Sequence, residues 1–122
     1  MASTAHHDDR IAAMTFASVY PHYVSKVERK GRSEAELMAV IAWLTALTEV
    51  EVKHHLEERS TFAELFAAAP MAAGAHLITG VICGYRVEEI ENALTQKVRW
   101  LDKVVDELAR GKAMEKICRQ PQ

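Results

Sequence analysis

Apolar side chains recur every three or four residues along most of the chain, which is the period of an α-helix. The longest such stripe runs through Val87, Ile90, Leu94, Val98, Leu101, Val105 and Leu108. It predicts one long amphipathic helix that ends at Gly111. Asn92 is a good helix-capping residue inside this stretch, so the helix either runs through it or starts afresh there. A last short helix that carries Met114 and Ile117 is expected after Gly111.

Three short motifs in the first half of the chain predict where helices begin. Each pairs a serine or threonine with a glutamate three residues later, the pattern of a capping box: Ser33 with Glu36, Thr48 with Glu51, and Thr61 with Glu64. In such a box, the two side chains accept hydrogen bonds from backbone N–H groups that the first helical turn leaves free. The close spacing of the motifs predicts short helices joined by tight connections.

The first apolar stripe, from Phe16 to Val27, predicts another helix. Pro21 restricts where this helix can start, because proline has no N–H to donate within a helix. With Ser18 as the N-cap, Pro21 would lie in the first turn, where the missing N–H costs nothing. We therefore expect the helix to start after Ser18 and to run to about Lys30.

The segment 76–86 is ambiguous, because its isoleucine, valine and tyrosine content suits a strand. Its apolar residues nevertheless follow helical spacing, whereas strand alternation would mix apolar and polar residues on both faces. We therefore expect a helix that Gly84 ends. A short hairpin over 76–87 is the alternative.

Length and composition set the overall class. A chain of 122 residues, 49% hydrophobic and 26% charged, can bury one core and has the composition of a globular protein. We expect an all-α fold, a compact bundle of about five to six short helices with one longer C-terminal amphipathic helix. Residues 1–8 are expected to form a flexible N-terminal tail, residues 9–119 a single helical domain, and residues 120–122 a C-terminal tail.

Charge and apolar runs limit the partners and the compartment. The formal net charge of -2 gives no overall attraction to nucleic acid or to an anionic membrane. No stretch reaches the roughly 18 apolar residues that span a bilayer, and the polar N-terminus lacks the pattern of a signal peptide. Cys83 and Cys118 are too few for a disulfide scaffold, and we interpret both as buried apolar residues. We therefore expect a cytoplasmic protein that contacts no membrane.

The residue types that usually carry catalysis or hold cofactors occur in unsuitable patterns. Glu51 and His54 form the one Glu-x-x-His pair, whereas a di-metal helical bundle needs that pair twice. The glycines form neither a dinucleotide-binding fingerprint nor a Walker loop. Cys83 lies near an expected helix C-terminus, where the helix dipole disfavours a thiolate. We expect no metal site and no cofactor, and these patterns argue against an enzyme.

One basic cluster offers an alternative contact for nucleic acid, and it consists of Lys26, Arg29, Lys30 and Arg32. Basic residues at the end of a helix also complement the dipole of that helix. The helix that would serve as a recognition helix carries more acidic than basic residues, and this balance repels phosphates. We therefore rank nucleic-acid binding below the other interpretations.

Several stretches of the chain carry a family resemblance. They are Phe16-Ala-Ser-Val-Tyr-Pro-His-Tyr-Val, Val27-Glu-Arg-Lys-Gly-Arg, Ile41-Ala-Trp-Leu-Thr, Leu77-Ile-Thr-Gly-Val-Ile-Cys-Gly-Tyr-Arg-Val-Glu-Glu-Ile-Glu-Asn and Leu101-Asp-Lys-Val-Val-Asp-Glu-Leu. Together they resemble an uncharacterised bacterial domain-of-unknown-function family, DUF2200. The resemblance implies a bacterial, cytoplasmic, stand-alone domain and brings no activity or site residue with it. Where the family pattern has proline after Asn92, this chain has Ala93.

The residues best suited to bind a ligand lie beside the glycines at 80 and 84. They are Cys83, Arg86 and Glu88, with Arg99 and Asp102 on the long helix. Glycine lets a ligand approach the backbone, and an arginine can bind a carboxylate through two parallel hydrogen bonds.

The sequence does not determine the function. The simplest interpretation is a small interaction or oligomerisation module that binds a protein partner or a second copy of itself. One alternative is a small-molecule or anion-binding protein, or a small enzyme, with a site near Cys83 and Arg86. The other is a weak nucleic-acid binder that uses the basic cluster.

Overall fold

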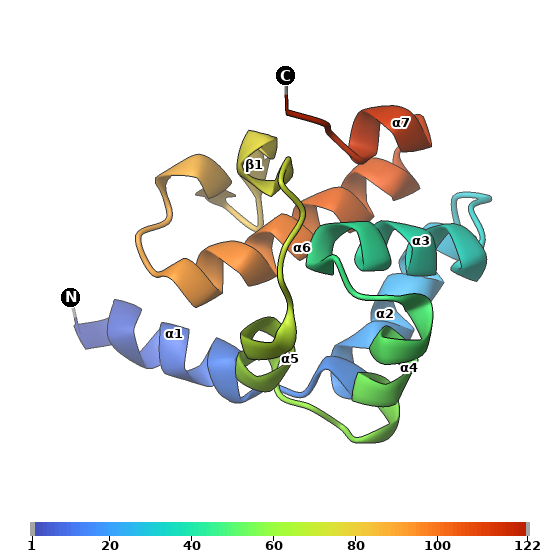
Figure 1. Cartoon of the computed structure of the whole chain (residues 1–122). Helices are drawn as coiled ribbons and strands as arrows, with labels where there is room; N and C mark the ends of the chain where they lie inside the picture. The colour runs from blue at the N-terminus through green and yellow to red at the C-terminus, as the bar shows by residue number, and fades with distance from the viewer. Residues whose placement is uncertain (1, 122) are drawn as a thin grey trace.

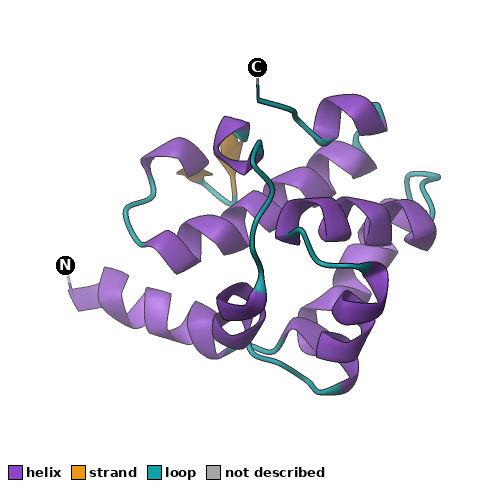
Figure 2. Cartoon of the chain, viewed as in Figure 1, coloured by secondary structure: helices purple, strands orange, loops and turns teal. Residues whose placement is uncertain are grey.

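The computed structural model describes residues 2–121, with side chains from residue 6 onward. The helices are α1 (Ala2–Ala13), α2 (Phe16–Glu28), α3 (Glu34–Thr45), α4 (Glu49–Glu57), α5 (Phe62–Ala68), α6 (Ala93–Ala109) and α7 (Met114–Ile117). Between α5 and α6 lie two 3₁₀ helices, η1 (Ala75–Leu77) and η2 (Val87–Glu89), and two strands, β1 (Val81–Ile82) and β2 (Tyr85–Arg86). Figure 2 shows how small these two strands are beside the helices. The expectation of a compact, mostly helical fold with one long helix near the C-terminus is confirmed.

The long helix α6 is the central element of the fold (Figure 1). Helices α1, α2, α3, α5 and α7 all pack against it, and so do β1 and η2. Its buried apolar side chains are Val98, Leu101, Val104, Val105, Leu108 and Ala109. Burial of such a stripe is the main source of helix stability in a domain of this size. The stripe is therefore covered by its own domain, so its amphipathic pattern is no evidence for self-association.

The predicted capping boxes are confirmed, and each one begins a helix. Backbone N–H groups of Glu36, Glu51 and Glu64 donate at 3.1 Å to the hydroxyl oxygens of Ser33, Thr48 and Thr61. In all three boxes the glutamate also accepts from the N–H of the capping residue. Asn92 caps α6 by accepting from the N–H of Thr95 at 2.9 Å. The long helix therefore starts at Ala93 and does not run through Asn92.

The prediction that Ser18 caps α2 is wrong. Thr15 is the cap, and its hydroxyl oxygen accepts from the N–H of Ser18 at 3.2 Å. Pro21 therefore lies inside α2 and leaves one helical hydrogen bond unmade. The earlier start is stabilised because the N–H of Phe16 donates to the carbonyl of Ser60 at 2.9 Å and the phenyl ring is fully buried. Tertiary packing here outweighs the local preference of proline.

The prediction of a helix over 76–86 is also wrong, and the alternative, a short hairpin, is confirmed. Strands β1 and β2 pair antiparallel, with Ile82 opposite Tyr85. The two-residue turn between them is Cys83-Gly84, with φ of 53° and 81°. Both residues adopt the left-handed backbone that two-residue hairpin turns require, and an α-helix cannot pass through it. Gly84 therefore serves a turn and does not end a helix.

The interpretation of both cysteines as buried apolar residues does not hold either. Cys83 is exposed at the hairpin turn, and Cys118, which follows α7, is half-buried; both are free thiols. A residue at the tip of a two-residue turn projects from the sheet rather than into the core. For Cys83, the error follows from the helix assigned to residues 76–86.

The N-terminal residues differ from the expected irregular tail. Residues 2–8 belong to α1, whereas Met1 lies outside the described residues. The buried side chain of Ile11 anchors this helix to the core. The hydroxyl of Thr95 on α6 donates to the carboxylate of Asp8 at 2.7 Å. These contacts are long-range, so the short-range pattern of a small polar segment did not reveal them.

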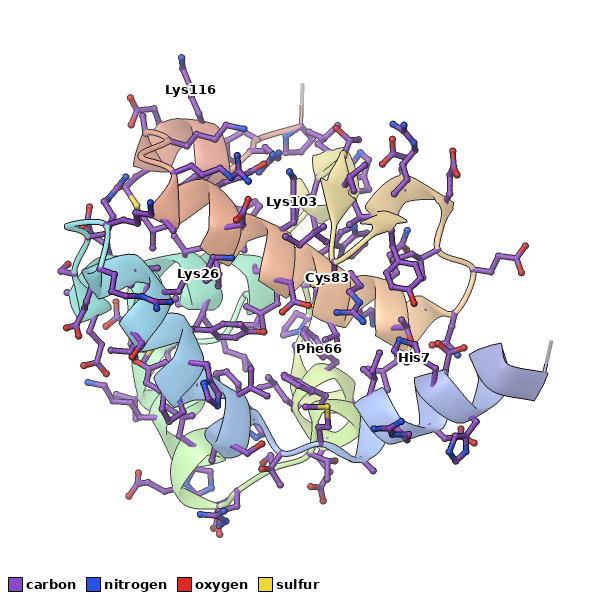
Figure 3. All side chains as sticks on the ribbon, turned by 180° about the vertical axis from the view of Figure 1, so that it is seen from behind. His7, Lys26, Phe66, Cys83, Lys103 and Lys116 are labelled. Atoms are coloured by element: carbon purple, nitrogen blue, oxygen red, sulfur yellow. The ribbon has the colours of Figure 1, made fainter. Side chains whose placement is uncertain are left out.

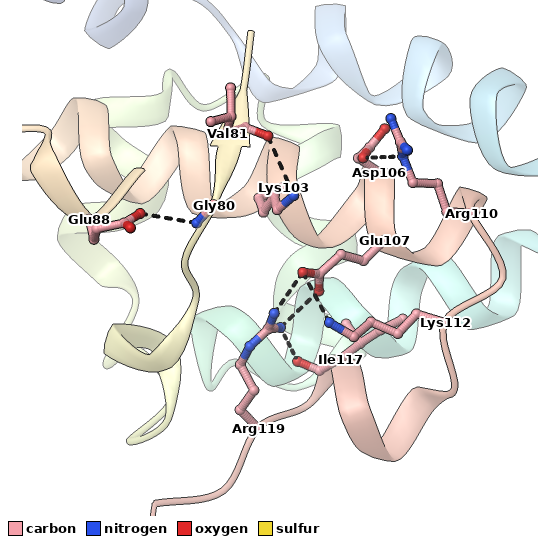
Figure 4. Close-up of polar contacts among 10 residues, drawn as sticks. All are labelled: Gly80, Val81, Glu88, Lys103, Asp106, Glu107, Arg110, Lys112, Ile117 and Arg119. Carbon is pink, nitrogen blue, oxygen red and sulfur yellow. Dashed lines mark hydrogen bonds and ion pairs between the residues drawn. The ribbon is translucent and has the colours of Figure 1, made fainter. Parts of the chain in front are cut away.

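The C-terminal half of α6 is fastened by buried charges (Figure 4). Glu107 accepts two hydrogen bonds from the guanidinium of Arg119, at 2.8 and 2.6 Å, and pairs with Lys112 at 3.3 Å. Gly74 lies so close to this C-terminal segment that an added Cβ would stand 2.0 Å from the carbonyl oxygen of Arg119. The segment after α7 is therefore packed down onto the body.

None of the helices within residues 2–121 is long and apolar enough to cross a membrane.

Candidate functional site

An open cleft of about 920 Å³ lies at the N-terminal end of α6, between α1 and the hairpin. Its walls come from α1 (His7, Asp8), the hairpin (Gly84, Tyr85, Arg86), the connector (Glu89, Ile90, Glu91, Asn92) and α6 (Thr95, Arg99). We call it the Arg99 cleft. Its size falls within the range of about 300–1,000 Å³ that is usual for small-molecule sites. Two stretches that are far apart in the sequence, residues 7–8 and residues 84–99, build it.

Asp102 fixes the position of Arg99, and Tyr23 in turn holds Asp102. Nη1 of Arg99 donates to Oδ2 of Asp102 at 3.0 Å, and the hydroxyl of Tyr23 on α2 donates to Oδ1 of the same carboxylate at 2.6 Å. Burial raises the pKa of Tyr23 well above its usual value, and the negative charge of Asp102 raises it further. Tyr23 therefore stays protonated and acts as a permanent donor. This chain of contacts holds the guanidinium at the cleft wall.

Arg99 also touches both sides of the cleft. Its guanidinium lies over the ring of Tyr85, 5.3 Å from the ring centroid, which is a cation–π arrangement. Its Nη2 lies 3.3 Å from Nε2 of His7. Because arginine can only donate, this contact requires that Nε2 of His7 be unprotonated. The ring of His7 stacks on Tyr85 with 6.0 Å between centroids. Figure 3 labels His7 on α1 and Cys83 in the hairpin turn, both beside α6.

The hydrogen-bonding capacity of Arg99 is not filled by the protein. Its Nε is buried and has no acceptor among the described residues; the other such side-chain atom is Nε1 of Trp100. An unsatisfied buried donor costs about 1–3 kcal/mol, so each instance needs an explanation. Arg99 therefore lines the cleft with a guanidinium whose hydrogen-bonding capacity the described residues do not fill.

The five residues that the sequence singled out occupy different positions around this cleft. Arg86 and Arg99 line it. Asp102 stands behind Arg99, as described above. Glu88 accepts from the N–H of Gly80 at 3.0 Å, and this bond lowers its pKa (Figure 4). Cys83 is exposed at the turn and is not part of the lining.

Sequence reasoning missed His7, Asp8 and Tyr85. His7 and Asp8 fell in the segment expected to be a tail, and only the packing of α1 brings them to α6. Tyr85 was counted as an apolar position on the wrong helix, although a hairpin exposes it by 45%. The signal that could have found Tyr85 was the glycine before it, because a left-handed turn at 83–84 projects the next residues outward.

The charges of the cleft are mixed. Two guanidinium groups face three carboxylates, and the carboxylates are those of Asp8, Glu89 and Glu91. Arg86 pairs only loosely with its acidic neighbours, at 3.7 Å from Glu88 and from Glu89, and more than half of its side chain is exposed. Arg86 can therefore bind an anion without giving up a short ion pair. The described residues contain no group of three or more histidine, cysteine or acidic side chains placed to hold a metal ion.

The fold and this cleft define a small helical protein with an open, mixed-charge cleft beside the N-terminal end of its central helix. Residues 10–119 match the family model DUF2200, "Uncharacterized protein conserved in bacteria", and the chain belongs to that family. The resemblance seen in the sequence is thereby confirmed.

A solved structure supports the fold directly. It is described as "Crystal structure of uncharacterized protein SP1917", and it is 39% identical to this chain with a TM-score of 0.82. The match covers 88% of this chain and 89% of that one. No curated protein matches the chain at a significant level. As expected from the sequence, neither the family match nor the solved structure determines a function.

Proposed function

We propose that this protein binds a small molecule in the Arg99 cleft, and that the ligand carries a carboxylate or similar planar anion together with a cationic or donor group. The observation that carries the proposal is the guanidinium of Arg99, which lines the cleft and is fixed by Asp102, while its buried Nε has no acceptor among the described residues. Among the sequence-based interpretations, this one corresponds to the alternative with a site near Cys83 and Arg86, moved from the thiol to the two arginines.

The mixed lining supports a ligand with both charges. A carboxylate suits the guanidinium groups of Arg86 and Arg99, because the two planar groups form parallel hydrogen bonds. An ammonium or a donor group suits the carboxylates of Asp8, Glu89 and Glu91. A simple anion meets only the first set and is repelled by the second. The ring of Tyr85 adds a flat surface for an aromatic or aliphatic part of the ligand.

A titration with three related small molecules tests the proposal. The test ligand is 4-(aminomethyl)benzoate, which carries a carboxylate, a ring and an ammonium; benzoate and benzylamine each lack one charged group. We expect saturable shifts of backbone amide NMR signals around 84–86 and 92–99 with the full molecule, and weaker binding of either half. If benzoate and benzylamine bind as tightly as 4-(aminomethyl)benzoate, the proposal that the ligand carries both charges is wrong.

A pair of matched variants tests whether the ligand binds in the Arg99 cleft. Arg86→Gln removes an exposed guanidinium from the lining, so the fold is unaffected while affinity for the test ligand falls roughly three- to tenfold. Arg29→Gln makes the same chemical change on an exposed residue outside this cleft and leaves the affinity unchanged. An equal loss in both variants would show a diffuse charge effect and would remove the proposal.

Protein–protein interaction is a second candidate, and one observation favours it. Leu77, Val81 and Tyr85 are exposed by 40%, 54% and 45% within one short segment around the hairpin. Exposed apolar side chains that gather in one place mark contact surfaces. Sedimentation of the chain over a range of concentrations tests self-association: a mass above 13.6 kDa that rises with concentration supports it, and a constant monomer mass contradicts it.

We also infer a cytoplasmic setting. Support comes from the two free thiols, one of them exposed at the hairpin turn, because such thiols persist in a reducing compartment.

A further inference from the structure

A second cleft of about 680 Å³ lies at the opposite end of α6 from the Arg99 cleft. Its lining consists of Lys26, Arg29, Lys30, Asp106, Ala109 and Arg110, which lie near the C-terminal ends of α2 and α6. We call it the Asp106 cleft. Figure 3 labels Lys26 on α2, and Figure 4 shows the pair of Asp106 and Arg110.

Asp106 organises two of the four cations. Its Oδ1 lies 3.0 Å from Nζ of Lys26, and its Oδ2 accepts from Nε of Arg110 at 2.8 Å. Although burial raises the pKa of Asp106, the hydrogen bonds and charges of Lys26 and Arg110 outweigh it and hold this pKa below its usual value. The carboxylate therefore stays charged at neutral pH, holds the two cations close together and is itself neutralised by them.

The other two cations of the cleft have no acidic partner among the described residues. Arg29 and Lys30 are exposed and take part in no ion pair within residues 2–121. Four cations and one carboxylate leave an excess of three positive charges around a single hollow, in a chain whose net charge is -2. Two helix C-termini offset part of this excess. The remainder is concentrated where a small anion can reach several cations at once.

The structure changes the membership of the basic cluster seen in the sequence. Arg32 does not belong to it, because its guanidinium donates to the carbonyl oxygens of Leu108 and Lys112 and to Glu36, and only 16% of its side chain is exposed. Arg110 takes its place. A concave group of four cations suits a compact ligand, whereas a nucleic-acid backbone needs an extended basic surface.

We propose that the Asp106 cleft binds the phosphate groups of a compact, multiply phosphorylated ligand. Arg29, Lys30 and the free N–H groups of Arg110 contact the phosphate oxygens, and Asp106 keeps Lys26 and Arg110 in position. Phosphate oxygens accept several charge-assisted hydrogen bonds at once, which matches the number of donors that meet here. This site is independent of the proposed Arg99 ligand.

Titration with inorganic tripolyphosphate, at an ionic strength held constant with sodium chloride, tests this site. We expect saturable amide shifts near 26–30 and 106–110. The double variant Arg29→Gln/Lys30→Gln changes exposed side chains only, so it folds normally and binds at least about tenfold more weakly. The control Lys53→Gln/Lys116→Gln removes the same charge from exposed positions outside the cleft and keeps affinity within about twofold of the wild type.

Three outcomes would overturn the proposal. One is the absence of saturable binding by the wild type, and another is an equal loss of affinity in the control. The third is a short DNA duplex that binds more tightly than tripolyphosphate and depends on Arg29 and Lys30, because that result would assign the surface to nucleic acid.

Discussion

The two halves of α6 differ in whether the hydrogen-bonding groups of their buried charged side chains are all paired. In the C-terminal half, Glu107 is surrounded by Arg119 and Lys112, and its two oxygens meet a bidentate guanidinium. In the N-terminal half, Arg99 lines an open cleft and is paired with Asp102, but its buried Nε has no acceptor among the described residues. The difference separates a network whose charged groups are fully paired from a group that we propose binds a ligand. Burial of charge alone would not have distinguished them.

Glu107→Gln should produce the largest effect, because it acts on the saturated half. The guanidinium of Arg119 is 15% exposed and would lose its charged partner in a nearly dry environment. We expect the free energy of unfolding to fall by about 2–4 kcal/mol, measured by urea denaturation.

The control for this variant is Glu115→Gln, which makes the same charge change at an exposed position of α7. It should stay within about 0.5 kcal/mol of the wild type. Equal stabilities for the two variants would mean that the network around Glu107 does not fasten the C-terminal segment.

Tyr23→Phe should have a smaller effect and acts on the other half. Loss of the hydroxyl bond to Asp102 costs about 1–2 kcal/mol at neutral pH. The folded protein holds the Tyr23 proton more tightly than the unfolded chain does, because its pKa is raised. The stability that this gives is complete below the unfolded pKa of about 10 and is lost as the pH rises above it.

Denaturation of wild type and Tyr23→Phe between pH 7 and pH 11 checks this sign. The difference in stability between them should shrink above about pH 10. A difference that grows in alkali would contradict the role of Tyr23 as a protonated donor to Asp102.

Cys83→Asn should have the smallest effect and tests the hairpin itself. Asparagine tolerates the left-handed backbone that Cys83 adopts at φ of 53°, so the variant should be about 0.5–1 kcal/mol more stable than Cys83→Ala. If the segment were a helix, alanine would be the better residue and the order would reverse. Thermal unfolding of the two variants decides between the orders.

Local chemistry explains which parts of the fold could be predicted. The capping boxes at Ser33, Thr48 and Thr61 were readable because both partners lie within four residues and satisfy the backbone of the same turn. The end of α6 just before Gly111 and the short helix with Ile117 were readable for similar reasons. Local signals of this kind do not depend on where the rest of the chain goes.

The elements that sequence reasoning missed depend on distant partners. Helix α1 is held by Ile11 in the core and by the bond between Asp8 and Thr95, and the start of α2 is fixed by the carbonyl of Ser60. The hairpin was missed because helical spacing of the apolar residues outweighed the turn signal of Gly84. That signal is weak because the residue before the glycine, Cys83, is of a type that rarely adopts a left-handed backbone.

The candidate sites were predicted in part, for the same reason. Arg86 and Arg99 were singled out because arginine beside glycine suits anion binding, and both line the Arg99 cleft. The opposite wall comes from α1, so His7 could not be foreseen. The basic cluster included Arg32 because it is adjacent in sequence, whereas folding directs that side chain to the end of α6.

The most direct test of the contrast between the two halves is the side-chain NMR spectrum of the arginine Nε–H groups during titration with 4-(aminomethyl)benzoate. We predict that the Arg99 signal shifts and saturates with the amide signals of the cleft, while the Arg119 signal does not shift. A stationary Arg99 signal, or one that moves together with that of Arg119, would contradict the assignment of Arg99 to a ligand site.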